Sequence, residues 1–256
     1  MIIPSAKQAN FNSSLLTRLF TSSGIVSVPP DVSCIWVNAC AGGGGGGGGY
    51  SGVGGGGGGG TPGSGCYQRL ISVIPGESLV VTVGASGTAG TVGNNGVDGG
   101  NTTIIGMSTY LSLLGGMKGY AGAVDRGGYG REAFINAPRN FLSPSGVISS
   151  WGAYPDYWMF VGNNGGAVSA NGTPSFNVGG VSLYIGAGIG DANGGGGGAG
   201  GGCLYGNGGS GSSSGVAGAA ATGYGAGGGG GGGNAAGGNG SPGFVQMFCW
   251  SAYSIN

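Results

Sequence analysis

Short runs of apolar and β-branched residues recur along the chain, separated by glycine-rich sequence. Residues 32–39, 68–74, 79–83, 101–105, 181–185 and 244–250 are such runs. Runs of this length and composition, bounded by turn residues, are typical of β-strands. Pro75-Gly76 lies between two of them and predicts a turn, so 68–74 and 79–83 are expected to form a hairpin. The pattern predicts a mostly β and irregular chain with little α-helix.

Uninterrupted glycine runs occupy 42–49 and 54–60, and similar runs recur at 194–198, 200–202 and 227–233. Glycine-rich sequence is usually a flexible linker. These runs, however, are flanked by expected strands instead of joining domains. Extended polyproline-II-like segments repeat every three residues and have no internal hydrogen bonds, so neighbouring segments can pair if glycine lets them approach closely. We therefore expect a bundle of polyglycine-II helices, clamped by the short β-strands, in one domain over 24–256.

Composition excludes several classes of protein. Glycine accounts for 73 of the 256 residues, but no strict Gly-X-Y period runs along the chain, which excludes collagen. Four Trp, eleven Tyr and eight Phe argue against general disorder. The net charge is zero and no basic patch is present, so nucleic-acid binding is not expected. Charged residues make up only 5% of the chain, which favours permanent incorporation in an assembly.

Residues 1–23 lack glycine before the first strand and differ from the rest of the chain. Leu15, Leu16, Leu19 and Phe20 fit a one-sided apolar stripe of a short amphipathic helix or an extended arm. Such an arm could dock onto another protein or pack back on its own domain. We expect an attachment arm over 1–23, with these four residues as candidates for partner docking. Met1-Ile2-Ile3-Pro4 lacks the basic n-region and apolar segment of a secretory signal, so no signal peptide is expected in these residues.

The order of elements from Phe20 onward resembles a known family. Phe20-Thr21-Ser22-Ser23-Gly24 and Val28-Pro29 precede a strand that runs directly into polyglycine at 42–49, and a hairpin at 70–84 and a closing strand at 243–253 follow. This order is similar to the glycine-rich domain of tailed-bacteriophage tail-fibre tip proteins, including the distal adhesins of T-even-like phages. The resemblance implies stacked polyglycine-II helices with loops at one end that bind the host surface. It covers about 20–253, except that 107–185 has no clear counterpart.

The middle region, about 107–180, therefore reads as an aromatic-rich insert. Charged residues gather at 117–139 with tyrosines among them, and the densest aromatic cluster follows at 151–160. Tyr and Trp beside a few polar groups suit a recognition surface. The alternatives are a small local core and a solvated charged face. The receptor-contact candidates are Tyr120, Tyr129, Trp151, Tyr154, Tyr157 and Trp158.

The sequence offers little catalytic chemistry. The chain has no histidine, and its seven carboxylates are scattered, mostly in turns or beside basic residues. Five cysteines show no metal-ligand spacing and suit small apolar positions in strands. We expect no enzyme, no cofactor and no metal. A glycan-cleaving activity using Asp125, Glu132 or Asp156 is an alternative that glycan release would test.

Together these features predict a phage tail-fibre or tail-tip structural protein that presents loops to a host surface glycan or outer-membrane protein. It would be assembled in the host cytoplasm, join other tail proteins through 1–23, and act as a homotrimer or as a monomeric cap on a trimeric fibre. The alternatives are a purely architectural virion component and an ice-binding polyglycine protein.

Overall fold

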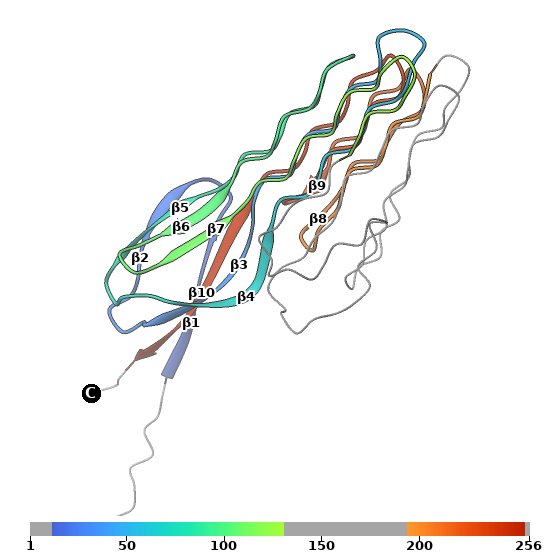
Figure 1. Cartoon of the computed structure of the whole chain (residues 1–256). Coiled ribbons are helices and arrows are strands. Elements are labelled where there is room, and N and C mark those ends of the chain that lie inside the picture. Colours follow the sequence, from blue (N-terminus) through green and yellow to red (C-terminus); the bar gives the residue numbers. More distant parts are fainter. Residues whose placement is uncertain (1–11, 131–193, 254–256) are drawn as a thin grey trace, which may run out of the picture.

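The computed structural model describes residues 12–130 and 194–253, and these form two continuous parts (Figure 1). Two antiparallel sheets of four strands each form one end of the molecule. Long glycine-rich segments, here called rods, extend from them to the other end. One sheet has the order β1-β10-β3-β4 and the other β2-β5-β6-β7. The described chain contains no helix, which confirms the expected mostly β and irregular class.

The strands of the first sheet are β1 (Asn12–Phe20), β10 (Phe244–Tyr253), β3 (Cys34–Cys40) and β4 (Gly65–Ser72). Those of the second sheet are β2 (Gly24–Ser27), β5 (Ser78–Thr82), β6 (Thr102–Ile105) and β7 (Tyr110–Leu113). Alternate side chains point between the sheets, as in β5, where Leu79 and Val81 are buried and their neighbours are exposed. With Val37, Ile104 and Val245 they form part of the apolar core of a sandwich.

The turn at Pro75-Gly76 is present, but the expected hairpin around it is wrong. Glu77 donates its N–H to the carbonyl of Ile74 at 3.0 Å, and Gly76 has a φ of 79°, which only glycine adopts without strain. Beyond this turn, however, β4 pairs with β3 and β5 pairs with β2 and β6. The turn therefore carries the chain from one sheet to the other.

A buried carboxylate ties this crossover to the neighbouring turn. The Glu77 side chain accepts N–H bonds from Ile74 at 2.7 Å and from Met107 at 2.8 Å, and a hydroxyl bond from Thr109 at 3.1 Å. The Ile74 N–H, followed by the Met107 N–H and the Thr109 hydroxyl, lowers the pKa of Glu77 against the opposing effect of burial. A sequence pattern of apolar runs does not reveal such a link, because Glu77 looks like an ordinary turn residue.

The rods show a three-residue repeat of hydrogen bonds. In the first central rod, 42–50, Gly42, Gly45 and Gly48 all donate to the rod at 94–101. Gly43, Gly46 and Gly49 donate to the rod at 235–243. Gly44, Gly47 and Tyr50 donate to the rod at 54–64. Three residues per turn is the repeat of the polyproline-II helix. The rods thus share the three-residue repeat of that helix.

Every backbone N–H and C=O of the first central rod has a partner in another rod. Its carbonyls accept from 84–93, 114–123 and 225–234, so six rods surround it, all at N···O distances of 2.8–3.0 Å. The second central rod, 227–233, has the same property and bonds to the first through Gly228 and Gly231. Because a buried unpaired peptide group is costly, this complete pairing offsets the large entropy that glycine loses on ordering.

Close packing explains why the central rod is pure glycine. A Cβ atom added at any position of 42–49 would lie 1.9–2.2 Å from a backbone carbonyl oxygen of a neighbouring rod. At Gly46, for example, the oxygen is that of Gly229, at 2.0 Å. Backbone atoms held by their own hydrogen bonds cannot move aside, so no side chain fits at these positions.

The outer rods keep glycine only where they face the centre. Gly84, Gly87 and Gly90 are buried. The residues between them, 85–86 and 88–89, are exposed or half-buried. Gly87, Gly90 and Gly93 donate to Gly43, Gly46 and Gly49 of the central rod. Residues 116–122 and 237–243 carry glycine with the same spacing. A local Gly-X-X repeat is therefore the sequence signature of an outer rod.

Part of the region expected to be an insert belongs to the sandwich and the bundle. Residues 110–113 form β7, which pairs with β6. Gly116, Gly119 and Gly122 then donate to Gly42, Gly45 and Gly48 of the central rod. Residues 107–130 are thus built into the sandwich and the bundle, and residues 131–193 lie outside the described ranges.

Candidate functional site

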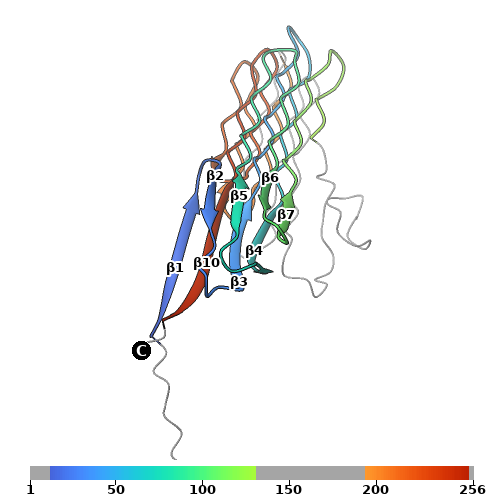
Figure 2. The same ribbon diagram turned by 90° about the vertical axis from the view of Figure 1, so that its left-hand side faces the viewer.

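The bundle ends in a set of turns at the end away from the sheets, where rods reverse direction (Figures 1 and 2). Three of these turns share one geometry. Asn94, Val216 and Ala235 each donate an N–H to the residue three positions earlier, at 2.9, 2.9 and 3.0 Å. The third residue of each turn has a positive φ: Gly93 at 74°, Gly215 at 76° and Asn234 at 64°. This is the signature of a type II turn, so the tips are short and well defined.

The tips present exposed apolar side chains. Val53, Val124 and Val216 are 57%, 60% and 55% exposed, and each lies at the reversal of a different pair of rods. Asp125 and Arg126, also exposed, are charged groups beside Val124. The arrangement makes an end surface with small apolar groups and few charges.

Two of the predicted receptor-contact residues are brought together close to one tip. Tyr120 donates its N–H to the carbonyl of Tyr129 at 2.9 Å, so these residues lie side by side on adjacent rods. The Tyr129 side chain is 53% exposed, and the Arg126 guanidinium lies 5.9 Å from its ring centroid. A cation over an aromatic face restrains both side chains. Trp151, Tyr154, Tyr157 and Trp158 lie outside the described residues.

The predicted docking residues fall on β1, an edge strand. Residues 12–20 form neither a helix nor a separate arm, because all nine pair with β10, from Asn12 opposite Tyr253 to Phe20 opposite Val245. Leu16 and Leu19 are exposed, at 42% and 58%, and Phe20 packs partly against the core. Leu15 pairs opposite Trp250. The strand thus packs on its own domain, as the second alternative expected, and in the described ranges no strand pairs with its outer edge.

A small aromatic cluster supports the bundle near the sheets. The hairpin of β8 (Gly206–Asn207) and β9 (Thr222–Gly223) brings Tyr205 and Tyr224 to within 4.7 and 4.9 Å of the Phe244 ring. The Tyr205 hydroxyl donates to the carbonyl of Cys66 at 2.6 Å, and burial raises the pKa of Tyr205. The interruptions at Leu204-Tyr205 and Tyr224 are chain reversals, as the sequence indicated, but they lie at the sheet end.

The cysteines near this cluster are thiols and not disulfides. Cys40 and Cys66 are buried, and burial raises the pKa of Cys40. Burial also raises the pKa of Cys203 to about 11, and its thiol donates to the carbonyl of Tyr224. Within 12–130 and 194–253, no group of three or more His, Cys, Asp or Glu residues could hold a metal ion. The same ranges contain no helix long and apolar enough to cross a membrane.

The tip valines are residues that sequence reasoning missed. Val53 is part of the interruption between two glycine runs, and Val124 follows a stretch with local Gly-X-X spacing. Interruption of the glycine spacing is therefore the signal that marks a tip.

Comparison with known proteins agrees with this architecture. A search of curated proteins gives no match. The model of a family described as a glycine-rich domain matches residues 20–248, which include β2 to β9, the first half of β10 and all the described rods. Because the match spans most of the sequence, the chain belongs to the glycine-rich domain family.

Proposed function

We propose that this protein is a structural component of a phage tail fibre or tail tip, and that the bundle tips attach the virion to a host cell surface. The observation that carries the proposal is the polarity of the molecule. The first and last described strand residues, Asn12 and Tyr253, pair with each other at the sheet end, whereas the valine-bearing tips lie at the opposite end. One end is suited to attachment and the other to presentation.

The construction of the bundle supports a role in rigid display. Both central rods have every peptide group bonded to a neighbouring rod, and no glycine in either run has a positive φ. A tip held on such a support loses little further conformational entropy when it binds, which favours affinity. Exposed valines and the Arg126–Tyr129 pair offer apolar and stacking contacts that suit a surface glycan or an outer-membrane protein.

An adsorption assay tests the proposal. Purified protein should bind susceptible cells and block adsorption of a phage that carries it. Val124→Asp and Tyr129→Ala should each weaken this competition at least severalfold. Val97→Asp is the matched control, since Val97 is 53% exposed on the side of the bundle and should keep full competition. Equal competition by all variants would show that the tips do not make the contact.

The architectural alternative is an outcome of the same assay. Wild-type protein that neither binds susceptible cells nor competes for adsorption would overturn receptor attachment and leave a structural role in the particle. Release of glycan fragments during the assay would instead support the enzymatic alternative, and thermal hysteresis of the purified protein would support ice binding.

A further inference from the structure

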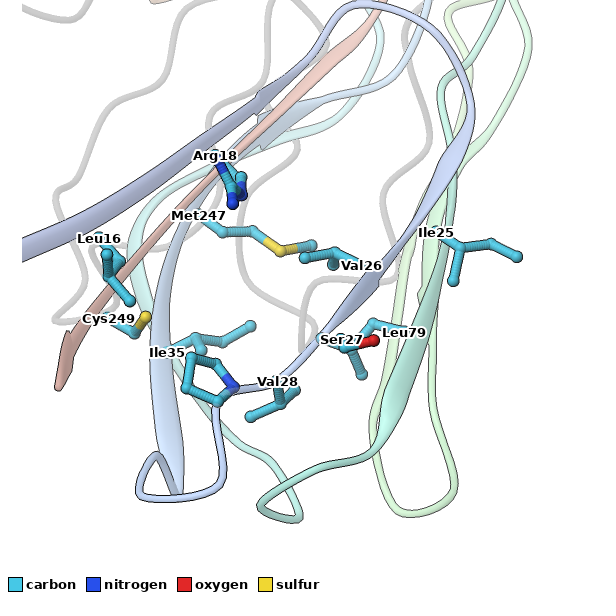
Figure 3. A pocket seen from close by; sticks show the side chains of 11 residues that line it. Leu16, Arg18, Ile25, Val26, Ser27, Val28, Ile35, Leu79, Met247 and Cys249 are labelled. Atoms are coloured by element: carbon cyan, nitrogen blue, oxygen red, sulfur yellow. The ribbon is translucent and has the colours of Figure 1, made fainter.

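An apolar groove of about 360 Å³ opens between the two sheets at one side of the sandwich (Figure 3). Its walls come from β1 and β10 on one side and from β2 and β5 on the other. Leu16 and Cys249 are directly opposite each other in the β1–β10 pair, as are Arg18 and Met247, and all four line the groove. Val26, Val28 and Leu79 line it from the second sheet.

The groove lies between two open sheet edges. β1 is the last strand of its sheet and β2 the last strand of the other, so in the described chain no further strand covers either edge. β1 pairs with β10 over nine residues without a bulge, and it contains no proline. Long, regular edges of this kind readily accept another strand, and natural proteins normally shorten, bend or cover them.

The lining contains one charged side chain, that of Arg18, and this charge limits what can bind. A wholly apolar strand would bury the guanidinium without a partner, which is costly. A strand that offers a carboxylate at the facing position would pair with it and place its apolar side chains beside Leu16, at the mouth of the groove. An inward-facing charge on an edge strand thus discourages indiscriminate pairing while favouring a complementary partner.

We propose that the β1 edge binds an extended segment of another polypeptide, apolar at alternate positions and carrying a carboxylate opposite Arg18. The segment adds as a further strand to the β1-β10-β3-β4 sheet and covers the groove. Main-chain hydrogen bonds along β1 supply affinity, and the groove and Arg18 supply specificity. This inference rests on the proposed function, since it gives the attachment end its mode of docking.

A labelled synthetic peptide tests this site directly. The probe is a nonapeptide of threonines with valine at positions 2, 4 and 8 and glutamate at position 6; a second peptide has lysine in place of glutamate. Binding is followed by fluorescence anisotropy, and hydrogen exchange of the β1 amides reports the location. The glutamate peptide should bind saturably and slow exchange in β1.

Charge reversal supplies the decisive comparison. Arg18→Glu should weaken binding of the glutamate peptide roughly tenfold and strengthen that of the lysine peptide, because attraction becomes repulsion. Lys118→Glu, on an outer rod, is the matched control and should change neither affinity. If Arg18→Glu fails to fold, Arg18→Gln should remove the preference between the two peptides.

Two results would overturn the inference: no saturable binding of either peptide to the wild-type protein, or a preference for glutamate that survives both Arg18 variants. Neither result would affect host attachment, because the free protein competes for adsorption through its tips. A folded Arg18→Glu protein should still block adsorption, so loss of strand docking and loss of receptor binding are separable.

Discussion

Gly90 donates its backbone N–H to the carbonyl oxygen of Gly46 at 2.8 Å, although the two residues belong to different rods. The link continues beyond this pair. Gly46 donates to Gly238 at 2.9 Å, and Gly237 donates to Gly90 at 2.9 Å. Three rods from distant parts of the sequence are therefore joined through their main chains alone, with no side chain between them.

Gly46→Ala should strongly destabilise the protein. The added Cβ would lie 2.0 Å from the oxygen and 2.5 Å from the carbonyl carbon of Gly229, both backbone atoms. We expect a loss of about 3 kcal/mol or more in the free energy of unfolding, measured by chemical denaturation. Gly93→Ala is the control: Gly93 has a positive φ but no atom within 4 Å of the added Cβ, so the cost should be about 1 kcal/mol. Equal losses would contradict the close packing described for the central rod.

Amide hydrogen exchange should be slow in the central rods despite their being pure glycine. Gly44, Gly47 and Gly58 each donate to a neighbouring rod and are buried, so their amides should exchange only on global unfolding. Ser51 and Val53, exposed at a tip, should exchange orders of magnitude faster. Mass spectrometry of peptides spanning 42–60 gives both values in one experiment. Fast exchange throughout this range would show that the runs behave as flexible linkers.

Thr102 should contribute through its hydroxyl and not through its shape. Its Oγ1 accepts from the N–H of Gly84 at 2.9 Å and donates to the carbonyl of Cys40 at 2.9 Å, and the side chain is fully buried. Thr102→Val leaves both groups unpaired and should cost about 1–3 kcal/mol in thermal unfolding. Thr102→Ser keeps the hydroxyl and should lose less. A serine variant as unstable as the valine variant would assign the effect to packing.

Acid should weaken the sandwich through Glu77. Its pKa is lowered in the folded state, so its contribution to stability is present above the unfolded value of about 4.3 and is lost as pH falls through the folded pKa. The unfolding midpoint should therefore decline below about pH 4.5. Glu77→Gln should be less stable at neutral pH, because its amide N–H₂ would face an N–H donor, and should show a flatter acid profile. A profile identical to wild type would contradict this role.

The thiols should react in the order of their exposure. Cys34 is exposed, whereas Cys40 and Cys66 are fully buried. With its pKa raised to about 11, Cys203 should be thiolate in only about one molecule per thousand at pH 8. Iodoacetamide at pH 8 should modify Cys34 first and should reach Cys40, Cys66 and Cys203 only in denaturant. Rapid labelling of Cys40 in the folded protein would show that the sheet–bundle junction opens.

Five of the described strands (β3, β4, β5, β6 and β10) and the ordered nature of the glycine runs were predictable from local sequence, whereas β1, β2 and β7 were not. The residues that flank 42–60 are β-forming. A flexible linker usually joins separate domains, whereas this segment connects β3 and β4, which pair in one sheet. The local period at 84–93 could also have been recognised, since Gly84, Gly87, Gly90 and Gly93 are spaced by three. This period is local and does not extend along the whole chain, because the central rods are uninterrupted glycine.

Strand pairing was not predictable in the same way. The Pro75-Gly76 turn fits a hairpin, yet β4 and β5 separate into different sheets because buried residues of both, such as Cys66 and Leu79, contribute to one core between the sheets. Gln68 has a φ of 49°, and its N–H bonds to the Asn38 side chain at 2.7 Å where the β3–β4 register shifts. Such a bulge depends on a residue 30 positions away and has no local signal.

The three-residue repeat also restricts how the length of the bundle can change. One residue inserted in 42–49 would rotate all later donors by a third of a turn, toward the wrong neighbours. Three residues would restore the direction but would lack opposite partners unless the surrounding rods grew by the same step. The bundle can therefore change length only in steps of three residues, and all its rods must change together. A tip can gain or lose residues without changes elsewhere. Among relatives, insertions and deletions should therefore occur mainly at the turns, and the rods should change length only by whole helical turns.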